Sequence, residues 1–241
     1  MPNSNDITPC EPPLGEIVDN WSPPPWPDRR AMDGQYCVVE PLDPDKHGAD
    51  LFRANRLDRE NRIWLYLPYG PFDTPQAYRE WLTATCLGDD PMFFAIIDKT
   101  TGKAAGVASY LRINPAAGSI EVGHINYAPP MQRTPMATEA MYLMMRNAFE
   151  LGYRRYEWKC NALNQRSRNA ALRLGFSYEG IFRQMMVVKG RNRDSAWYGI
   201  IDKEWPALER AFQIWLAADN FDDDGMQRQS LSDLTAGALG R

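Results

Sequence analysis

The chain has 241 residues, of which 44% are hydrophobic and 12% aromatic, so it can bury a substantial core and general disorder is excluded. It carries 27 lysines and arginines against 31 acidic residues, a net charge of −4, which argues against a nucleic-acid partner. No apolar run reaches the roughly 18 residues that span a bilayer, and no basic segment followed by an apolar one opens the sequence. We therefore expect a single cytoplasmic globular domain with no membrane partner.

The cysteines and histidines are too dispersed to predict a metal site. Cys10, Cys37, Cys86 and Cys160 show no CxxC spacing, and the two histidines of the chain are far apart in the sequence. The cysteines are therefore interpreted as reduced thiols, and no metal is expected.

Residues 1–30 are rich in proline, with the runs PCEPP and WSPPPWP. Proline lacks a backbone N–H and favours extended conformations, so this segment is predicted to be an arm without regular structure. Trp21 and Trp26 are expected to pack on the domain, and the alternative is a polyproline ligand for an aromatic groove of a partner. The patterns further predict one globular domain over residues 31–216 and a loose polar tail over residues 217–241.

The first half of the domain is predicted to contain a strand, two helices and three more strands. Residues 35–42 have the composition of a strand, and the next acidic and proline-led segment predicts a helix over residues 43–56. A second helix is predicted over residues 73–88, with Asp73 or Thr74 as its N-cap. Three strand-like runs at about ten-residue spacing then predict an antiparallel meander over residues 92–98, 103–113 and 118–127.

The second half opens with a long amphipathic helix, predicted over residues 134–152 because apolar side chains recur there at helical spacing. The elements expected after it are a strand over residues 154–160, a short helix over 165–175, a hairpin over 176–202 that turns near Gly190, and an amphipathic helix over 206–218.

The turn Gln132-Arg133-Thr134-Pro135-Met136 lies where a predicted strand ends and the long helix begins. The first backbone amides of a helix have no partner within it, and the helix dipole adds roughly half a positive charge, so this turn suits a pyrophosphate. Thr134 fits the N-cap and Pro135 the first helical position, while Arg133 can supply a full charge. Taken alone, the turn is better interpreted as an ordinary capped helix with solvated Gln132 and Arg133.

A second motif follows about thirty residues later. Asn164, Ser167 and Ala171 recur at three- and four-residue spacing along one face of the short helix, which Gly175 and Phe176 follow. These two motifs, in this order on these elements, resemble those of the GNAT superfamily of N-acetyltransferases. Within the superfamily the chain resembles the branch that includes the ribosomal-protein N-terminal alanine acetyltransferases. The resemblance covers roughly residues 35–202 and is densest over 121–180.

The resemblance implies a fold and an activity. The fold would be α/β (α+β), a GNAT fold with a mixed central sheet of about seven strands, flanking helices and a splayed strand pair that holds an acyl-CoA. The activity would be transfer of an acetyl or short acyl group from acetyl-CoA, as co-substrate, to a primary amine by direct attack and without a metal. The acceptor would be a small-molecule amine or a peptide N-terminus, and the protein a monomer or homodimer. The alternative is a catalytically degenerate CoA-binding or scaffold protein that recruits a partner through the proline-rich arm.

The resemblance also implies the residues that hold the cofactor. Main-chain amides of the turn would bind the pyrophosphate, the preceding strand would pair with the pantetheine arm, and the short helix would contact that arm and, through Ser167, the thioester sulfur. These residues are Ile125, Asn126 and Tyr127 on the strand, Gln132, Arg133, Thr134, Met136, Ala137 and Thr138 in the turn and first helical turn, and Asn164 and Ser167 on the short helix.

Three positions depart from the family pattern. Pro135 stands where the family has a glycine, so the turn lacks one amide donor. Ala171 stands where many members have a tyrosine, and Met186 where some ribosomal-protein acetyltransferases have a glutamate. The general base is therefore the position that the resemblance defines least.

Attack on a thioester needs a neutral amine, so some group must accept a proton. Glu121 and His124, on the strand that enters the turn, are the candidate bases, and Glu157 on the next strand is a further option. Strand alternation predicts that Glu121 and His124 face opposite sides, so that only one of them faces the site, and a histidine on a buried strand can equally be a core residue. Ser167, Tyr127 or water would protonate the departing thiolate, and a strand amide near Asn126 or Tyr127 would meet the oxyanion.

Cys160 and the segment GRNRDS can each be interpreted either as structural or as functional. Cys160 is a possible covalent nucleophile, but direct transfer is the favoured prediction. The segment GRNRDS predicts a hairpin turn with surface ion pairs, in which Arg191 or Arg193 could reach the carboxylate of an acceptor.

Overall fold

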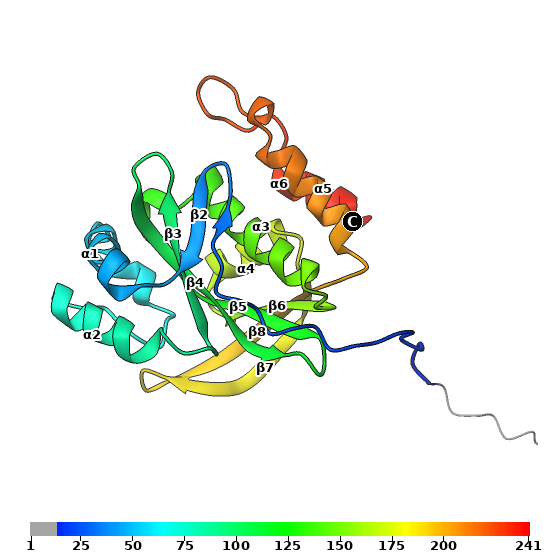
Figure 1. The fold of residues 1–241 in the computed structure, drawn as a ribbon, viewed down its shortest axis with the longest axis horizontal. Coiled ribbons are helices and arrows are strands. Elements are labelled where there is room, and N and C mark those ends of the chain that lie inside the picture. The colour runs from blue at the N-terminus through cyan, green and yellow to red at the C-terminus, as the bar shows by residue number, and fades with distance from the viewer. Residues whose placement is uncertain (1–13) are drawn as a thin grey trace, which may run out of the picture.

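The computed structural model describes residues 14–241, so the PCEPP run lies outside the described residues. One eight-stranded sheet runs through the molecule in the order β1-β2-β3-β4-β5-β6-β8-β7 (Figure 1). Its strands are β1 (Met32–Asp33), β2 (Cys37–Pro41), β3 (Met92–Asp98), β4 (Lys103–Asn114), β5 (Ser119–Tyr127), β6 (Arg155–Asn161), β7 (Ser177–Val188) and β8 (Arg191–Ile201). Neighbouring strands are antiparallel except β5 and β6, which pair in parallel. The predicted mixed sheet is confirmed. Its eighth strand is the two-residue β1, which is too short to leave a periodic pattern in the sequence.

Helices cover both faces of this sheet (Figure 1). One face, which we name the α2 face, packs α1 and α2 over a buried apolar cluster that includes Leu82 and Phe93. The other, the α3 face, packs α3 and α5 over a larger cluster that includes Tyr110 and Phe212. The helices are α1 (Pro44–Asn55), α2 (Pro75–Thr85), α3 (Pro135–Glu150), α4 (Gln165–Arg173), α5 (Trp205–Leu216) and α6 (Leu231–Ala238), with short 3-10 turns η1 (Arg62–Trp64), η2 (Pro129–Met131) and η3 (Ala218–Asn220).

Capping side chains fix where the helices near the candidate site begin. The Thr74 hydroxyl oxygen accepts from the Ala77 amide at 3.1 Å, so Thr74 and not Asp73 is the N-cap of α2. Thr134 caps α3 in the same way, and both caps are followed by proline at the first helical position, where no donor is lost.

A buried carboxylate on α3 fastens this helix to the N-terminal strands. Glu139 is 4% exposed and accepts hydrogen bonds from the backbone amides of Gln35, Tyr36 and Cys37 at 2.6, 2.7 and 2.8 Å. A Cβ on Gly34 would lie 2.5 Å from the Glu139 carboxyl carbon, so this close approach requires glycine. The anchor fixes the position of α3 against the sheet, and with it the start of the helix.

The described part of the arm, residues 14–30, has no regular secondary structure; residues 14–23 are exposed, and the arm lies against the domain over residues 24–27. Pro24 and Pro27 are buried, and the Tyr153 hydroxyl donates to the Pro25 carbonyl at 3.2 Å. The Arg154 guanidinium lies 5.8 Å from the centre of the Trp21 ring. The arm therefore packs on its own domain over these residues.

The C-terminal residues differ from the loose polar tail expected over 217–241. Residues from Leu231 onward form α6, with Leu231 and Thr235 buried, and α6 packs on α4 and α5. The Thr235 hydroxyl donates to the Arg173 carbonyl at 3.2 Å. The helix has only eight residues and one well-buried apolar side chain, so its amphipathic pattern is too short to stand out from a polar segment.

Candidate active site

The only parallel strand pair among the described residues comes apart halfway along its length. β5 and β6 are paired from Ser119 and Arg155 to Val122 and Trp158, and no pairing continues to the ends of the two strands. β5 stays paired with β4 and β6 with β8, so each strand keeps one partner while their facing edges lose theirs. The backbone groups of residues 123–127 that face β6 are therefore available to an extended ligand, except the Tyr127 carbonyl, which accepts from the Gln132 side-chain amide at 2.8 Å.

A bulge lies in β5 where the strands separate. Val107 pairs with Asn126 and Ser109 with Gly123, so β5 holds one residue more than β4 over this stretch. His124 adopts a left-handed conformation with φ of +50° in the bulge. Residues after the bulge consequently face the opposite side from the one that simple alternation predicts.

This bulge makes the predicted separation of Glu121 and His124 wrong. Glu121 ion-pairs with Lys159, whose ammonium lies over Trp197 on the α2 face, and His124 contacts Phe93 of the apolar cluster on that same face. Both candidate bases therefore lie on the α2 face. No sequence motif marks the bulge, because a positive φ is uncommon for any residue other than glycine, histidine included.

The three residues that follow His124 are also reoriented by the bulge. Ile125 and Tyr127 pack against the cluster on the α3 face, whereas Asn126, paired with Val107, faces the α2 side. Asn126 is 2% exposed, and its Nδ2 has no hydrogen-bond acceptor within residues 14–241. A buried donor in that state calls for a ligand or a water molecule.

The turn before α3 has the geometry of an anion site. Arg133 has φ of +62° and Thr134 is extended, so successive amides converge at the start of the helix. No hydrogen bond within the described residues occupies the amides of Arg133, Thr134 and Met136. The Ala137 amide donates a hydrogen bond to the Thr134 hydroxyl oxygen at 3.4 Å. The turn itself is held by the Gln132 side-chain amide, which donates to the Tyr127 carbonyl at 2.8 Å.

Arg173 reaches this turn from the end of α4, and the sequence motifs did not indicate it. Its Nη1 donates to the Thr138 hydroxyl oxygen at 3.0 Å, and its guanidinium carbon lies 4.8 Å from the centre of the Trp215 ring. Burial lowers the pKa of Arg173, which marks it as a poorly hydrated cation. The helix dipole and Arg173 therefore both favour an anion near the first turn of α3.

Ser167 and Asn164 lie together at the start of α4. The Asn164 Oδ1 accepts from the Ser167 amide at 3.2 Å, so Asn164 is the N-cap of the helix. The Trp158 indole donates to the Ser167 hydroxyl oxygen at 3.0 Å, which leaves the hydroxyl proton free to be donated elsewhere. Cys160 lies beside Ser167, and burial raises the pKa of its thiol, which disfavours a thiolate nucleophile.

Tyr127 is separated from this group. Its hydroxyl donates to the Ala137 carbonyl at 3.4 Å on the α3 face, and burial raises its pKa above the ordinary value. Ser167 and Tyr127 are thus not brought together by the fold.

Glu121 belongs to a chain of ion pairs across the α2 face. It is 3% exposed, with Arg112 Nη1 2.8 Å from one carboxylate oxygen and Lys159 Nζ 2.7 Å from the other. Burial raises the pKa of Glu121, although Lys159 and Arg112 oppose that shift. The chain continues from Lys159 to Glu157 at 2.7 Å and from Glu157 to Arg155 at 2.6 Å.

His124 lies in an aromatic environment on the same face. Its Nδ1 is 3.3 Å from the Tyr69 hydroxyl, the two rings are stacked with centres 5.6 Å apart, and Phe93 lies 5.0 Å away. Burial, together with the positive charges of Arg112 and Arg193, lowers the pKa of His124 to about 4. His124 is therefore neutral at physiological pH.

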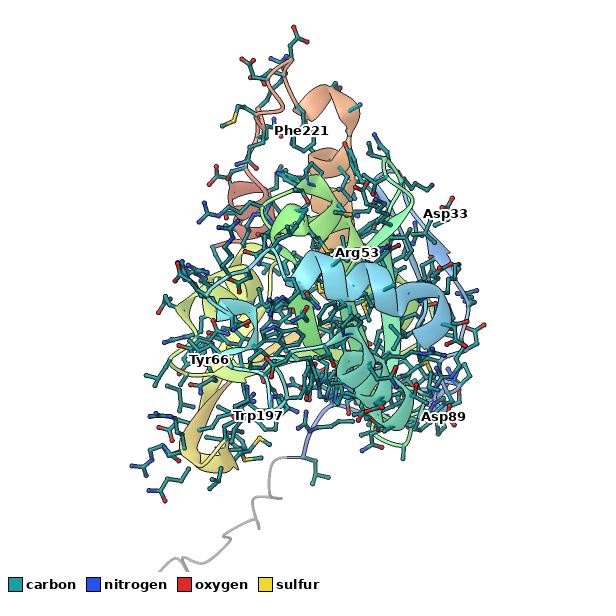
Figure 2. The ribbon with its side chains drawn as sticks, turned by 90° about the vertical axis from the view of Figure 1, so that its left-hand side faces the viewer. Asp33, Arg53, Tyr66, Asp89, Trp197 and Phe221 are labelled. Atoms are coloured by element: carbon teal, nitrogen blue, oxygen red, sulfur yellow. The ribbon has the colours of Figure 1, made fainter. Side chains whose placement is uncertain are left out.

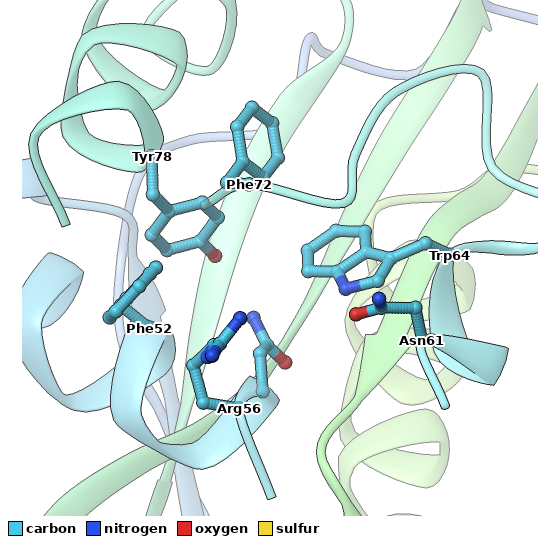
Figure 3. Close-up of a pocket in the computed structure, with 7 residues that line it drawn as sticks. Phe52, Arg56, Asn61, Trp64, Phe72 and Tyr78 are labelled. Atoms are coloured by element: carbon cyan, nitrogen blue, oxygen red, sulfur yellow. The ribbon is translucent and has the colours of Figure 1, made fainter. Parts of the chain in front are cut away.

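A small cavity between α1, η1 and α2 is a separate feature (Figure 3). It is lined by aromatic side chains that include Trp64 and Tyr78, together with Asn55, whose buried amide has no hydrogen-bond partner within residues 14–241. Its volume of about 10 Å³ is room for one water molecule, so it fits neither an acceptor nor a cofactor.

Over residues 14–241, no three cysteine, histidine or acidic side chains come close enough together to hold a metal ion. In the same range no helix combines the length and the apolar character that crossing a bilayer requires.

The parted parallel strands, leading through a short turn into a helix with open amides, define a GNAT-type α/β fold. A family model described as an acetyltransferase (GNAT) domain matches residues 38–177, which is more than half of the chain. The chain belongs to the GNAT acetyltransferase family, and the predicted resemblance is confirmed.

Solved structures agree with this assignment. The chain is 48% identical to a GCN5-related N-acetyltransferase from Brucella melitensis, over 90% of this chain and 99% of that one, with a TM-score of 0.89. It is 40% identical to a probable acetyltransferase of the GNAT family from Chromobacterium violaceum, over 83% and 100% of the two chains, with a TM-score of 0.76. The ribosomal L7/L12 α-N-protein acetyltransferase RimL, solved in complex with coenzyme A, shares the fold at 20% identity over 71% and 98% of the chains, with a TM-score of 0.61. A comparison with curated proteins gives no match.

Proposed function

We propose that this protein is an N-acyltransferase that moves an acetyl or short acyl group from coenzyme A to a primary amine by direct attack. The observation that carries the proposal is the separation of β5 from β6 after Val122 and Trp158, on the strand that leads into the open start of α3. No observation on residues 14–241 favours the alternative of a degenerate scaffold.

The residues around the separated strands fit coenzyme A. The amides of Arg133, Thr134 and Met136 would bind the diphosphate, with Arg173 nearby, and Pro135 removes only an amide that the first helical position leaves without an intrahelical partner. The unpaired edge of residues 123–127 would bind the pantetheine amides as an added strand. Bound acetyl-CoA supplies the activated acyl group.

The α2 face would receive the amine. An amide on the unpaired edge of β5 near Asn126 would stabilise the oxyanion, and the Asn126 side chain adds a buried donor. Holding the amine against the acyl carbon supplies much of the rate acceleration, because positioning replaces a bimolecular encounter.

His124 is the better placed of the two candidate bases. Both carboxylate oxygens of Glu121 are held by cations, whereas His124 is neutral and has an unprotonated nitrogen that can accept the amine proton directly or through water. Ser167 would donate its hydroxyl proton to the departing thiolate, since Trp158 already occupies the Ser167 oxygen as donor. Glu121 would then orient Arg112 and Lys159 rather than take a proton.

The proposal is tested by binding and by turnover. Calorimetry with acetyl-CoA should show saturable binding with a dissociation constant in the range of about 1 μM to 1 mM, which is usual for enzyme substrates. A library of primary amines, screened by detection of free thiol, should then yield at least one acceptor. Absence of cofactor binding at millimolar concentration would exclude the proposed activity.

A further inference from the structure

Arg193, on β8, is a half-buried cation without a partner in the described part of the chain. Its guanidinium makes no ion pair or hydrogen bond there, and its Nε is fully shielded from solvent. Burial lowers the pKa of Arg193, so the group has lost hydration without gaining a protein acceptor. Such a guanidinium is costly to bury unless an anion joins it.

The strand register places Arg193 on the α2 face. β8 pairs with β6 through Trp197 with Lys159 and Ser195 with Asn161, and side chains two residues apart along a strand face the same side. Trp197 lies on the α2 face, where the Lys159 ammonium is 3.8 Å from the centre of its ring, so Arg193 faces that side too. Figure 2 looks from the side of α1 and α2 and labels Trp197 on this hairpin.

Arg193 lies on β8 beyond the last residue of β6, at the end of the sheet where β5 and β6 are separated. The Asp194 carbonyl accepts from the Ala162 amide at 2.8 Å, in the turn that leads from β6 to α4. The positive charge of Arg193 acts on His124 and on Cys160, which lie on the two sides of the separation. Arg193 is therefore close to the place where the amine and the acyl group would meet.

The ion pairs of this face do not include Arg193, although the charge of Glu121 acts on it without direct contact. Cations and carboxylates alternate along one chain, so each charge has an opposite neighbour; its members are Arg112, Glu121, Lys159, Glu157, Arg155 and Glu179. Arg193 is an additional cation outside that chain. Its sequence neighbour Asp194 makes no ion pair with it, because successive side chains of a strand face opposite sides; the Asp194 carboxylate instead accepts from the Gln184 amide at 2.7 Å and the Asn192 side chain at 3.0 Å.

We infer that the acceptor amine carries a carboxylate and that Arg193 binds it, which makes an amino acid or a similar amino-carboxylic acid the substrate class. This inference rests on the proposed acyl transfer. A guanidinium pairs with a carboxylate through two parallel hydrogen bonds, which fixes the orientation of the acceptor as well as its affinity.

The test compares each of the standard L-α-amino acids with its own carboxamide as acceptor, at saturating acetyl-CoA and with thiol release as the readout. The pair differs in the charge of the recognised group and retains the amine. At least one free acid should show a kcat/KM about 10- to 100-fold above that of its amide, as expected for a hydrogen-bonded charge. In Arg193→Gln this preference should fall to within about twofold through a higher KM for the acid, and Arg193→Lys should restore part of it. Arg191→Gln, an exposed cation of the same hairpin, is the matched control and should keep the preference.

The outcomes separate this inference from the proposed function. Transfer to amides or plain amines without a preference for acids would overturn the carboxylate assignment and leave acyl transfer intact, as would a preference that survives in Arg193→Gln. No thiol release with any acid, amide or plain amine would contradict both. Calorimetry with coenzyme A should give the same dissociation constant for Arg193→Gln and for the unchanged protein, which shows that the variant is folded.

Discussion

The Nδ1 atom of His124 lies 3.3 Å from the hydroxyl of Tyr69, and the two rings are stacked with an angle of 15° between their planes. Tyr69 belongs to the segment between η1 and α2, whereas His124 lies in the bulge of β5. This contact joins the α2 layer to the point where the parallel strands separate. It also keeps His124 in an apolar environment, which accounts for its low pKa of about 4.

The pH dependence of the rate follows from this environment. Because His124 is already neutral above about pH 5, kcat/KM should rise with pH through the pKa of the acceptor amine and show no inflection near 6.5. His124→Gln should lower kcat by about 10- to 100-fold. Tyr69→Phe keeps the stacked ring and should retain activity within about threefold. An inflection near 6.5 that disappears in His124→Gln would contradict the assigned pKa.

Stability should depend on pH through the same residue. The pKa of His124 is about 4 in the folded protein and about 6.5 in an unfolded chain, so between these values the unfolded state binds a proton that the folded state does not. The free energy of unfolding therefore falls as the pH drops from about 6.5 to 4, by about 3 kcal/mol from this residue. Urea titrations of the unchanged protein and of His124→Phe isolate the contribution, and equal pH slopes for the two would argue against it.

Arg173 should affect coenzyme A but not its pantetheine portion. Removing the cation beside the first turn of α3 with Arg173→Gln should raise the dissociation constant of coenzyme A by about 5- to 10-fold. Pantetheine lacks the diphosphate, so its binding should change by less than about twofold, and Arg173→Lys should recover part of the affinity. Calorimetry with both compounds measures this. Equal losses for the two compounds would mean that Arg173 acts through its packing on Trp215 instead.

The role of Ser167 is expected to be modest. A thiolate with an ordinary pKa near 8.5 is already a tolerable leaving group, so Ser167→Ala should lower kcat by less than about 10-fold. KM for acetyl-CoA should change little, because Asn164 still caps α4. Steady-state kinetics on this variant decides the point, and a loss of about a thousandfold would indicate that Ser167 has a larger part in the chemistry than proton donation to the thiolate.

Much of the fold was predictable because its signals are local. Helix starts at Thr74 and Thr134 follow from a capping side chain and a proline, and the meander follows from strand-like runs separated by turn residues. The two motifs around Thr134 and Asn164 indicated the family for the same reason. Each motif consists of a turn and the start of the helix that follows it, so its residues are close together in the sequence.

What the sequence did not reveal depends on contacts between distant segments. The bulge at His124 exists because β4 and β5 pair with a shifted register, and it reversed the predicted relation of Glu121 and His124. The hydrogen bond from Arg173 to Thr138 joins residues that are 35 positions apart in the sequence. Contacts with α4 and α5 hold α6 in place, and the eight-residue sequence of α6 is too short to predict them. Neither local propensity nor motif spacing carries that information.

A crystal structure of the protein with coenzyme A would show whether the start of α3 and the separated strands β5 and β6 hold the cofactor. We expect the diphosphate within hydrogen-bond distance of the amides of Arg133, Thr134 and Met136, and the pantetheine between β5 and β6 from Gly123 onward. Density for the diphosphate elsewhere, or β5 and β6 paired along their full length with the cofactor bound outside them, would contradict it.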